Sequence, residues 1–520
     1  MDILRSSSFS GLFCAVTALA LGACGGGGGG GDGGDPGGGG WTAGVFMPSE
    51  SFAGQCVTPR SGTSDIQGTL LDGNNYLRSW SDETYLWYDE IVDQDPALFD
   101  STLDYFNELR TQALTASGAD KDKFHFTFPT DEWLQLSQSG VSAGYGAQWI
   151  LLSAAPPREV VVAYTEPDSP ATAPTVDLAR GAAVLVIDGA DVVNGNDVDT
   201  LNAGLFPANT GETHTFTVRD LGATNTREIT MISDAITQTP VQNVTTVASP
   251  MGTVGYLLFN DHIATAETGL INAVEQLATA NIDELVVDIR YNGGGFLAIA
   301  SQLAYMIAGS GPTAGRVFEE IQFSDKHPTT DPVTNQPLEP IPFISTTLGP
   351  PFPEPAGQPL PTLDLPRVFV LTGPNTCSAS ESIMNGLRGV NLEVIQIGST
   401  TCGKPYGFYP TDNCGTTYFT IQFRGINDQG FGEYTDGFTP ENVTGGTAVT
   451  GCSVADDFTH ALGDPLESRF QAALMYLENA SCPTPSGIAV PGLAKASTPL
   501  SATDGIMPKS PWRENRILRR

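Results

Sequence analysis

Basic residues are scarce in this chain of 520 residues, in which 24 Lys and Arg stand against 58 Asp and Glu. The formal net charge is −34 at pH 7. This charge argues against nucleic acid as a partner, because the protein and the backbone phosphates would repel each other. The same charge disfavours broad adsorption onto anionic lipid. These numbers fit an acidic exported protein.

Long apolar segments are also rare. After the run Leu12–Leu21, which is itself too short to span a bilayer comfortably, no segment is long and apolar enough to cross a membrane. The run ends in Leu21-Gly22-Ala23-Cys24, which resembles the bacterial lipobox, whose cysteine is lipidated and becomes the mature N-terminus. We expect a lipoprotein signal peptide over 1–23, lipidation of Cys24 and attachment to the periplasmic face of the outer membrane of a bacterial cell envelope. A plain signal peptide is the alternative.

Glycine is abundant directly after this cysteine. The run Gly25–Gly40 is almost pure glycine, so it has no side chains to bury and a large backbone entropy. We therefore expect a flexible tether over 24–54. The lipid on Cys24 would be the protein's only contact with the membrane.

Zinc-type ligand spacing is absent, since the chain has no CxxC pair and no His/Cys cluster. We predict no metal and no other cofactor. Six cysteines lie beyond the export segment: Cys56, Cys377, Cys402, Cys414, Cys452 and Cys482. In an exported protein they suggest up to three disulfides with 15 pairings to choose from. Cys402 and Cys414 flank a short segment and could close a hairpin.

Four patterns follow one another along the rest of the chain. Residues 55–138 place apolar and aromatic side chains at helical spacings, most clearly in Asn75–Tyr88. Residues 139–240 contain short β-rich runs. Residues 245–482 alternate strand and helix patterns, which predicts an α/β core with a mostly parallel sheet. Residues 483–520 have a loop-like composition, and we expect a disordered tail.

The β-rich runs resemble a PDZ domain of the type associated with bacterial proteases. The resemblance rests on Gly144-Tyr145-Gly146-Ala147, on the run Glu159–Tyr164 and on the later run Val184–Gly189. It implies that the backbone N–H groups of Gly144, Tyr145, Gly146 and Ala147 receive the terminal carboxylate of a peptide, which adds a strand to the sheet edge. A generic small β domain is the alternative.

A serine and a lysine stand about one βα unit apart in the α/β region. Thr376-Cys377-Ser378-Ala379-Ser380-Glu381 sets a serine at a strand-to-helix turn, and Cys402-Gly403-Lys404-Pro405 follows. A serine hydroxyl becomes a good nucleophile only when a base removes its proton, and a lysine can do so if burial lowers its pKa. The pair therefore indicates a serine-lysine hydrolase.

Three motifs resemble those of the C-terminal processing (tail-specific) proteases, the S41 peptidases. Asp288–Gly295 is similar to their D-L-R-x-N-x-G-G motif, Ser378–Glu381 to their S-A-S-E motif and Gly398–Lys404 to their G-x-x-T-x-G-K motif. The resemblance runs from about Trp80 to Leu477. It implies a ClpP/crotonase-like α/β protease core preceded by a PDZ-like domain and a small helical region.

The resemblance also implies the role of each site residue. Ser378 would be the nucleophile, with Ser380 as the competing choice, and Lys404 the general base. The tetrahedral intermediate needs preplaced donors for its oxyanion, which the amides of Ala379 and Gly294 would supply. Asp288 and Arg290 are expected to organise the turn rather than to take part in the chemistry.

One departure from the family pattern concerns the base. Many members carry a glutamine four residues after the lysine, where it helps to hold the lysine, but Phe408 stands there in this chain. The residue that orients Lys404 is left open among Glu381, Tyr406 and Gln422. The Ser-to-Lys interval is also one residue longer than the common pattern, which an extra loop residue near Gly389–Asn391 would absorb.

The expected function is a serine endopeptidase that cleaves polypeptides near their C-termini, with capture of the substrate by the PDZ-like domain. Two alternatives remain. His262, one of five histidines, could make the enzyme a serine-histidine hydrolase. The chain could also be a catalytically inactive, lipid-anchored peptide-binding protein.

Overall fold

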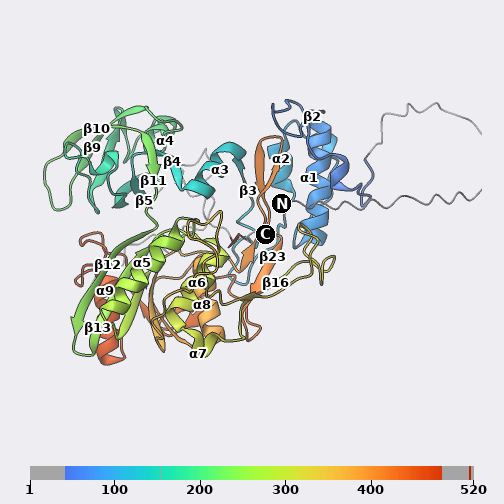
Figure 1. Ribbon diagram of the computed structural model, residues 1–520. Helices are drawn as coiled ribbons and strands as arrows, with labels where there is room; N and C mark the ends of the chain where they lie inside the picture. The colour runs from blue at the N-terminus through green and yellow to red at the C-terminus, as the bar shows by residue number, and fades with distance from the viewer. Residues whose placement is uncertain (1–40, 154, 483–514, 517–520) are drawn as a thin grey trace, which may run out of the picture. The chain divides into compact units, whose positions relative to one another are not determined.

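The computed structural model describes residues 41–153, 155–482 and 515–516 (Figure 1). The expectations for the signal peptide, Cys24 and the glycine run lie outside these residues. In the described part, no helix has the length and apolar character needed to cross a membrane. The described end of the expected tether contacts the next region, because the backbone N–H of Ser49 donates to the Glu83 carboxylate at 2.8 Å.

The N-terminal region is built on helix α1, Leu70–Thr84. Thr69 caps it, since its hydroxyl accepts from the Asp72 backbone N–H while the Asp72 carboxylate accepts from the Thr69 backbone N–H. The aromatic face of α1 is buried at Trp80, whose ring stacks on Phe106 of helix α2. The other elements of this region are β1 Gln55–Cys56, β2 Ile66–Gln67, α2 Thr102–Glu108, β3 Phe126–Pro129 and α3 Thr130–Ser139.

The next region is a small β domain with its own apolar core. Its main sheet has the order β10-β9-β7-β6-β5, with β8 paired to β7, and β4 and β11 form a separate pair. Strand β5 is therefore an edge of the sheet. The strands are β4 Val141–Gly144, β5 Ala147–Ser153, β6 Glu159–Thr165, β7 Ala183–Ile187, β8 Ala190–Asp191, β9 Thr213–Arg219, β10 Arg227–Ile232 and β11 Asp234–Thr237, and the helix is α4 Val198–Leu205.

The third region is the α/β core. Its sheet has the order β12-β13-β14-β18-β19-β26, in which β12 is antiparallel to β13 and all other neighbours are parallel. The prediction of a mostly parallel sheet is confirmed. The strands are β12 Val241–Ser249, β13 Gly252–Phe259, β14 Glu284–Asp288, β18 Arg367–Thr372, β19 Glu393–Gly398 and β26 Gly451–Ser453.

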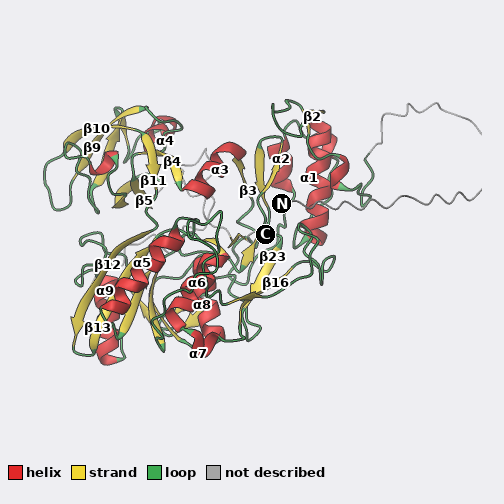
Figure 2. Ribbon diagram, in the orientation of Figure 1, coloured by secondary structure: helices red, strands yellow, loops and turns green. Residues whose placement is uncertain are grey.

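Helices cover both faces of this sheet (Figure 2). Alternate strand residues face opposite ways, so Val287 and Val370 pack in the cluster with α5 Ala266–Thr279, α6 Leu297–Ala308 and α8 Ala379–Gly389. Their neighbours Val286 and Phe369 pack in a second cluster with α9 Ser468–Asn479. Strands buried on both faces explain the continuous apolar runs in the sequence.

Short strands surround the core. Their bounds are β15 Gly295–Phe296, β16 Val317–Gln322, β17 Ile341–Pro342, β20 Tyr406–Gly407, β21 Thr411–Asn413, β22 Thr416–Phe419, β23 Phe423–Ile426, β24 Phe438–Pro440, β25 Thr447–Val449 and β27 Asn515–Arg516, and α7 spans Ser310–Thr313. Strand β22 pairs with β3, so the N-terminal region shares a sheet with the core. Of the C-terminal tail the structure describes only β27, which pairs with β15 in parallel.

The six cysteines form three disulfides: Cys56–Cys414, Cys377–Cys402 and Cys452–Cys482. The suggested pairing of Cys402 with Cys414 is therefore wrong. The segment between these two residues does not fold back as one hairpin. It leaves the core, forms β20 and then reaches β21 beside the N-terminal region.

A buried charge network ties the core to the β domain. Arg290 is fully buried and contacts Asp288 at 2.8 Å, Glu467 at 2.7 Å and Asp456 at 2.7 Å. Asp456 also accepts from Arg180 of the β domain at 2.7 Å. Burial alone would raise the pKa of Asp456, but the surrounding arginines hold it well below its usual range. Arg290 thus joins the carboxylates of the core and, through Asp456, Arg180 of the β domain.

Replacing Arg290 with Gln should destabilise the fold by about 3–5 kcal/mol, because it leaves the carboxylates of Asp288 and Glu467 buried without a cation. Arg316→Gln is the matched control, since Arg316 is 42% exposed in its pair with Asp428 and should cost about 1 kcal/mol or less. Urea unfolding followed by circular dichroism measures both. Equal losses in the two variants would contradict the assignment.

Candidate active site

The three predicted motifs meet at one edge of the core sheet. The turn at Asn292 follows β14, Ser378 follows β18 and Lys404 follows β19, and these three strands are neighbours in the order β14-β18-β19. Because parallel strands end at the same edge, their following loops converge there. The loop after β13, which carries His262, joins them.

Ser378 occupies a strained turn between β18 and α8. Its φ is +61° and its ψ is −122°, a conformation that non-glycine residues rarely adopt and that the surroundings must hold. The side chain is fully buried, and its Oγ has no hydrogen-bond partner among the described residues. Such a hydroxyl is not committed to a structural bond.

Ser380, the competing choice, is engaged in the structure. Its hydroxyl donates to the main-chain oxygen of Asn292 at 3.0 Å. The backbone N–H of Cys377 donates to the same oxygen at 3.1 Å. Asn292 thereby fastens both sides of the Ser378 turn, and this arrangement favours Ser378 over Ser380 as the nucleophile.

Gly294 lies against the Ser378 turn. A Cβ added at Gly294 would come within 2.7 Å of the Ser378 Cβ and 3.0 Å of the Ala379 amide nitrogen, and its φ is +106°. Only glycine fits there. Its N–H donates to the side-chain oxygen of Asn292 at 3.0 Å, so an oxyanion would have to replace that bond. Ala379 is the first residue of α8, where N–H groups lack intrahelical acceptors.

The carboxylate of Glu381 joins the serine loop to the lysine loop. One oxygen, Oε2, accepts from the Ser378 backbone N–H at 2.9 Å and from the Lys404 backbone N–H at 2.8 Å. The other, Oε1, accepts from the Gly403 backbone N–H at 2.9 Å and from the Thr401 hydroxyl. Burial raises the pKa of Glu381, and these hydrogen bonds oppose that shift.

Lys404 is fully buried in an aromatic pocket. Its Nζ lies 4.2 Å from the centre of the Phe408 ring and 5.2 Å from that of the Phe124 ring. Phe408 therefore lines the pocket of the lysine from the position where a glutamine was expected. Of the three residues suggested to orient Lys404, Glu381 binds its backbone, and the Gln422 side-chain oxygen accepts from the Tyr409 backbone N–H at 2.7 Å.

His262, the alternative base, is buried beside the glycine turn. Its Nδ1 donates to the Asn292 side-chain oxygen at 2.9 Å, and its backbone N–H donates to Gly294 O at 3.2 Å. The Phe296 backbone N–H donates to His262 O at 2.9 Å. These contacts give His262 a structural part in holding the turn.

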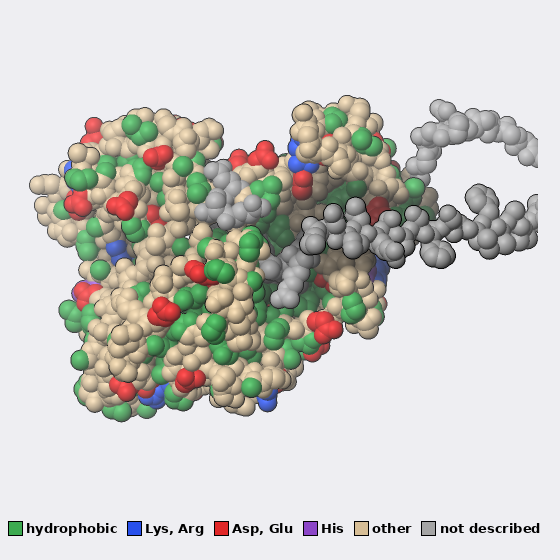
Figure 3. All heavy atoms as spheres, in the orientation of Figure 1, with side chains coloured by type: hydrophobic (Ala, Val, Ile, Leu, Met, Phe, Trp, Pro, Cys, Tyr) green, Lys and Arg blue, Asp and Glu red, His purple; other side chains and the backbone are tan. Residues whose placement is uncertain are grey.

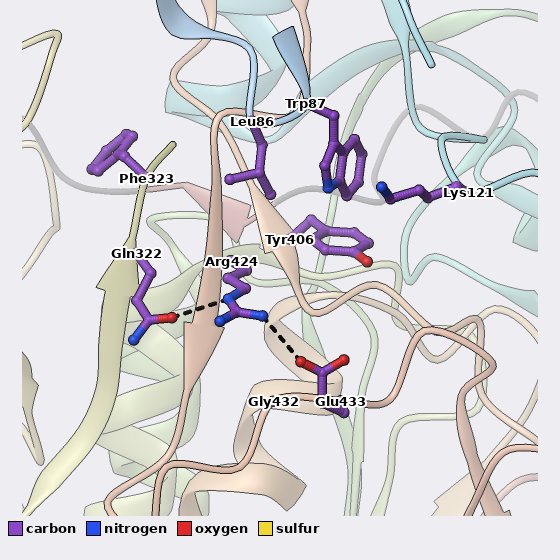
Figure 4. Close-up of a pocket in the computed structure, with 9 residues that line it drawn as sticks. All are labelled: Leu86, Trp87, Lys121, Gln322, Phe323, Tyr406, Arg424, Gly432 and Glu433. Carbon is purple, nitrogen blue, oxygen red and sulfur yellow. Dashed lines mark hydrogen bonds and ion pairs between the residues drawn. The ribbon is translucent and has the colours of Figure 1, made fainter. Parts of the chain in front are cut away.

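A pocket of about 410 Å³ is lined by Tyr406, which follows Lys404 by two positions in the sequence (Figure 4). The Trp87 and Tyr406 rings meet edge to face at 4.8 Å between their centres. Lys121 and Arg424 bring positive charge to the same walls, and Glu433 pairs with Arg424 at 3.0 Å. The remaining lining residues are Leu86, Gln322, Phe323 and Gly432. The walls of the pocket therefore combine apolar and charged side chains.

The segment predicted to bind peptide begins the edge strand of the β domain. Gly144 ends β4, Tyr145 is buried in the apolar core, and Ala147 starts β5. Gly146 has a φ of +75°, and its oxygen accepts from the Glu166 backbone N–H at 2.6 Å. The indole N–H of Trp149 on β5 donates to Leu205 O, so the edge strand is packed on the end of α4.

Among the described residues, the one group with the spacing of a metal site is Cys377, Glu381 and Cys402. Both cysteines are bonded to each other as a disulfide, so their sulfur atoms are not thiolates that could bind a metal. The acidic surface agrees with the composition, because Figure 3 shows acidic side chains spread over the visible face with fewer basic ones among them.

The geometry of the core agrees with a comparison to known families. Residues 253–408 match the model of Peptidase family S41, a segment that runs from β13 to Phe408 and includes Ser378 and Lys404. Over this segment the chain is homologous to S41 peptidases, and this homology supports a peptidase activity.

One curated relative and one solved structure are similar to longer stretches of the chain. The chain is 28% identical over 277 residues to a carboxyl-terminal-processing protease of Picosynechococcus sp., covering 52% of this chain and 56% of the relative. The chain thus spans little more than half of that relative. A crystal structure of an S41 protease from Bacteroides fragilis shares its fold, with a TM-score of 0.58, 21% identity and coverage of 82% of this chain and 100% of that one.

Two features of the site escaped the sequence analysis. Asn292 was seen as part of a turn, yet its side chain and main chain bind Gly294, His262, Cys377 and Ser380. Phe124 lies 280 residues before Lys404 in the chain and belongs to no motif. The only signal for it was the aromatic stretch Phe124–Phe128.

Replacing Glu381 with Gln should lower kcat/KM by about 100-fold. The amide group offers one acceptor oxygen and one NH₂ donor where the carboxylate accepts on both oxygens, so one set of backbone N–H groups loses its partner. Glu320→Gln, an exposed change on β16, is the control. Steady-state kinetics and thermal unfolding would check this, and unchanged kinetics in Glu381→Gln would contradict the role of Glu381.

Proposed function

We propose that this protein is a serine endopeptidase that cleaves polypeptides near their C-termini, with Ser378 as nucleophile and Lys404 as general base. The observation that carries the proposal is the sharing of Glu381 Oε2 by the backbone N–H groups of Ser378 and Lys404. Because both N–H groups donate to this one oxygen atom, the backbones of Ser378 and Lys404 are held side by side. The S41 match over 253–408 supports the same chemistry.

In the first step, Ser378 Oγ attacks the scissile carbonyl carbon while Lys404 Nζ takes its proton. The mechanism needs an uncharged amine, and a buried apolar pocket is the setting in which a lysine can be uncharged near neutral pH. The Ala379 N–H and the Gly294 N–H receive the oxyanion, and the latter exchanges its bond to Asn292 for this one. One such donor is worth about 3–4 kcal/mol in known serine proteases.

In the second step, the Lys404 ammonium gives its proton to the leaving amine, and the acyl group stays on Ser378. Water then attacks the ester with Lys404 again as base, which releases the acid and restores the serine. The pocket beside Tyr406 would hold a substrate side chain on one side of the scissile bond.

The β domain would deliver the substrate. An extended peptide can add to the edge strand β5, with its terminal carboxylate at the Gly144–Ala147 segment. Export and lipidation at Cys24 belong to the same proposal and rest on the N-terminal sequence alone. They would place the enzyme among polypeptides of the cell envelope.

Ser378→Ala and Lys404→Ala should each lower kcat/KM on an unfolded protein substrate by about 10⁴-fold or more, since each removes one half of the dyad. Ser380→Ala is the matched control on the same helix. It loses one hydrogen bond and should cost less than about tenfold. Activity that survives in Ser378→Ala or Lys404→Ala would contradict the dyad, and complete loss in His262→Ala with retained folding would favour a histidine base.

Amidation of the substrate's C-terminus should raise KM by about tenfold or more and leave kcat nearly unchanged. The loss of the charge removes charge-assisted hydrogen bonds at the β domain and leaves the bond that is cleaved unchanged. Acetylation of the N-terminus of the same peptide, which removes the other terminal charge, should have little effect. Equal KM values for the free and amidated peptides would contradict capture by the terminal carboxylate.

A further inference from the structure

The Cys377–Cys402 disulfide joins the two catalytic segments themselves. Cys377 directly precedes Ser378, and Cys402 stands two residues before Lys404. Their Cα atoms are 5.1 Å apart, and the bond closes a loop that contains α8 and β19. The link therefore encloses the whole βα unit that separates nucleophile from base.

The turn that the disulfide holds needs restraint. Ser378 has a positive φ. This backbone conformation is strained in a residue other than glycine, so the surrounding structure must hold it in place. The noncovalent restraints are hydrogen bonds: Cys377 N–H to Asn292 O at 3.1 Å, Cys402 N–H to Thr376 O at 3.0 Å and the bonds to Glu381. Each of these can open and re-form on its own. The disulfide is the covalent link among them.

The same disulfide packs in the pocket of the base. Cys377 is fully buried and Cys402 is 8% exposed, and both belong to the apolar cluster that contains Phe124 and Phe408. These are the two rings beside Lys404 Nζ. Removal of the two sulfur atoms would leave a cavity that the rings could fill by moving. The disulfide thus constrains both members of the dyad.

The other two disulfides stand elsewhere. Cys56–Cys414 joins β1 to the turn between β21 and β22, and Cys452–Cys482 joins β26 to the segment after α9. In the chain-entropy view, a disulfide stabilises more when it closes a longer loop. Cys56–Cys414, with a separation of 358 residues, should therefore contribute more to stability than Cys377–Cys402, with 25. The disulfides Cys56–Cys414 and Cys452–Cys482 therefore serve as controls for Cys377–Cys402.

We propose that Cys377 and Cys402 are positioning residues of the peptidase site, whose disulfide fixes the Ser378 turn and the Lys404 pocket relative to each other. The proposal rests on the function proposed above. It makes catalysis depend on this disulfide, whereas the other two disulfides contribute to the stability of the fold.

The test compares the double variants C377A/C402A, C56A/C414A and C452A/C482A in the full chain. We expect C377A/C402A to lose about 10- to 100-fold in kcat with KM within about threefold, because a small displacement of reacting groups costs this much. Its pH–rate profile should shift, since the surroundings of Lys404 change. C56A/C414A should keep kcat and show the larger fall in Tm. A normal kcat and pH profile in C377A/C402A would overturn the proposal.

Backbone hydrogen exchange gives a readout that does not require activity. Exchange at 376–381 and 399–404 should be faster in C377A/C402A than in the wild type and unchanged at these segments in the controls. If C377A/C402A fails to fold, wild-type protein treated with dithiothreitol replaces it. The reagent gives up two electrons and two protons per disulfide and becomes its cyclic disulfide, and mass spectrometry of alkylated cysteines counts the bonds reduced.

The two readouts separate failure of this inference from failure of the proposed function. A wild type that does not cleave polypeptides contradicts the peptidase, while the exchange comparison still decides whether the disulfide holds the two segments. An active wild type with unchanged exchange and kcat in the protein lacking only this disulfide rejects the positioning role alone.

Discussion

The site depends on one buried carboxylate, that of Glu381, placed where the serine turn and the lysine loop meet. The Glu381 carboxylate accepts four hydrogen bonds from the nucleophile turn and the lysine loop. These bonds offset the free-energy cost of burying the carboxylate, and they hold the two loops together. Its position on the first turn of α8 follows from the motif, because a residue three places after Ser378 faces back toward the start of the helix. The parallel sheet supplies the rest by ending three neighbouring strands at one edge.

Most of this arrangement could be predicted from local sequence. Continuous apolar runs marked the strands β13, β14, β18 and β19, and the last three are each followed by a motif with glycine, serine or lysine at a turn. Such signals are local, since a strand buried on both faces and a helix that starts at a fixed residue can be recognised within about ten positions. The motifs then fell at the same sheet edge because parallel strands all point one way.

Contacts between distant segments could not be predicted. Phe124 reaches the Lys404 pocket because β3 pairs with β22, which no local pattern announces. The disulfide pairing depended on where the chain goes after Lys404, and the short interval between Cys402 and Cys414 suggested a partner that the fold rules out. The bond from Gly294 N–H to Asn292 is a detail of side-chain placement that a motif of residue types does not contain.

The departure at Phe408 has a physical explanation in the structure. Where relatives were expected to hold the lysine with a polar side chain, this chain places the base between aromatic rings and fastens its backbone to Glu381. An apolar pocket favours the uncharged amine, while the rings interact favourably with a cation, so the two effects oppose each other during turnover. The nearby disulfide belongs to the same apolar cluster as these rings.

The central claim is that Ser378 is a nucleophile activated by Lys404. Its most direct test is covalent labelling with a fluorophosphonate, followed by mass spectrometry to identify the modified residue and its rate of modification. The account predicts that Ser378 alone among the serines of α8 and its turn is modified, and that Lys404→Ala slows the reaction by about 100-fold or more. Modification of Ser380 instead, or an equal rate in Lys404→Ala, would contradict it.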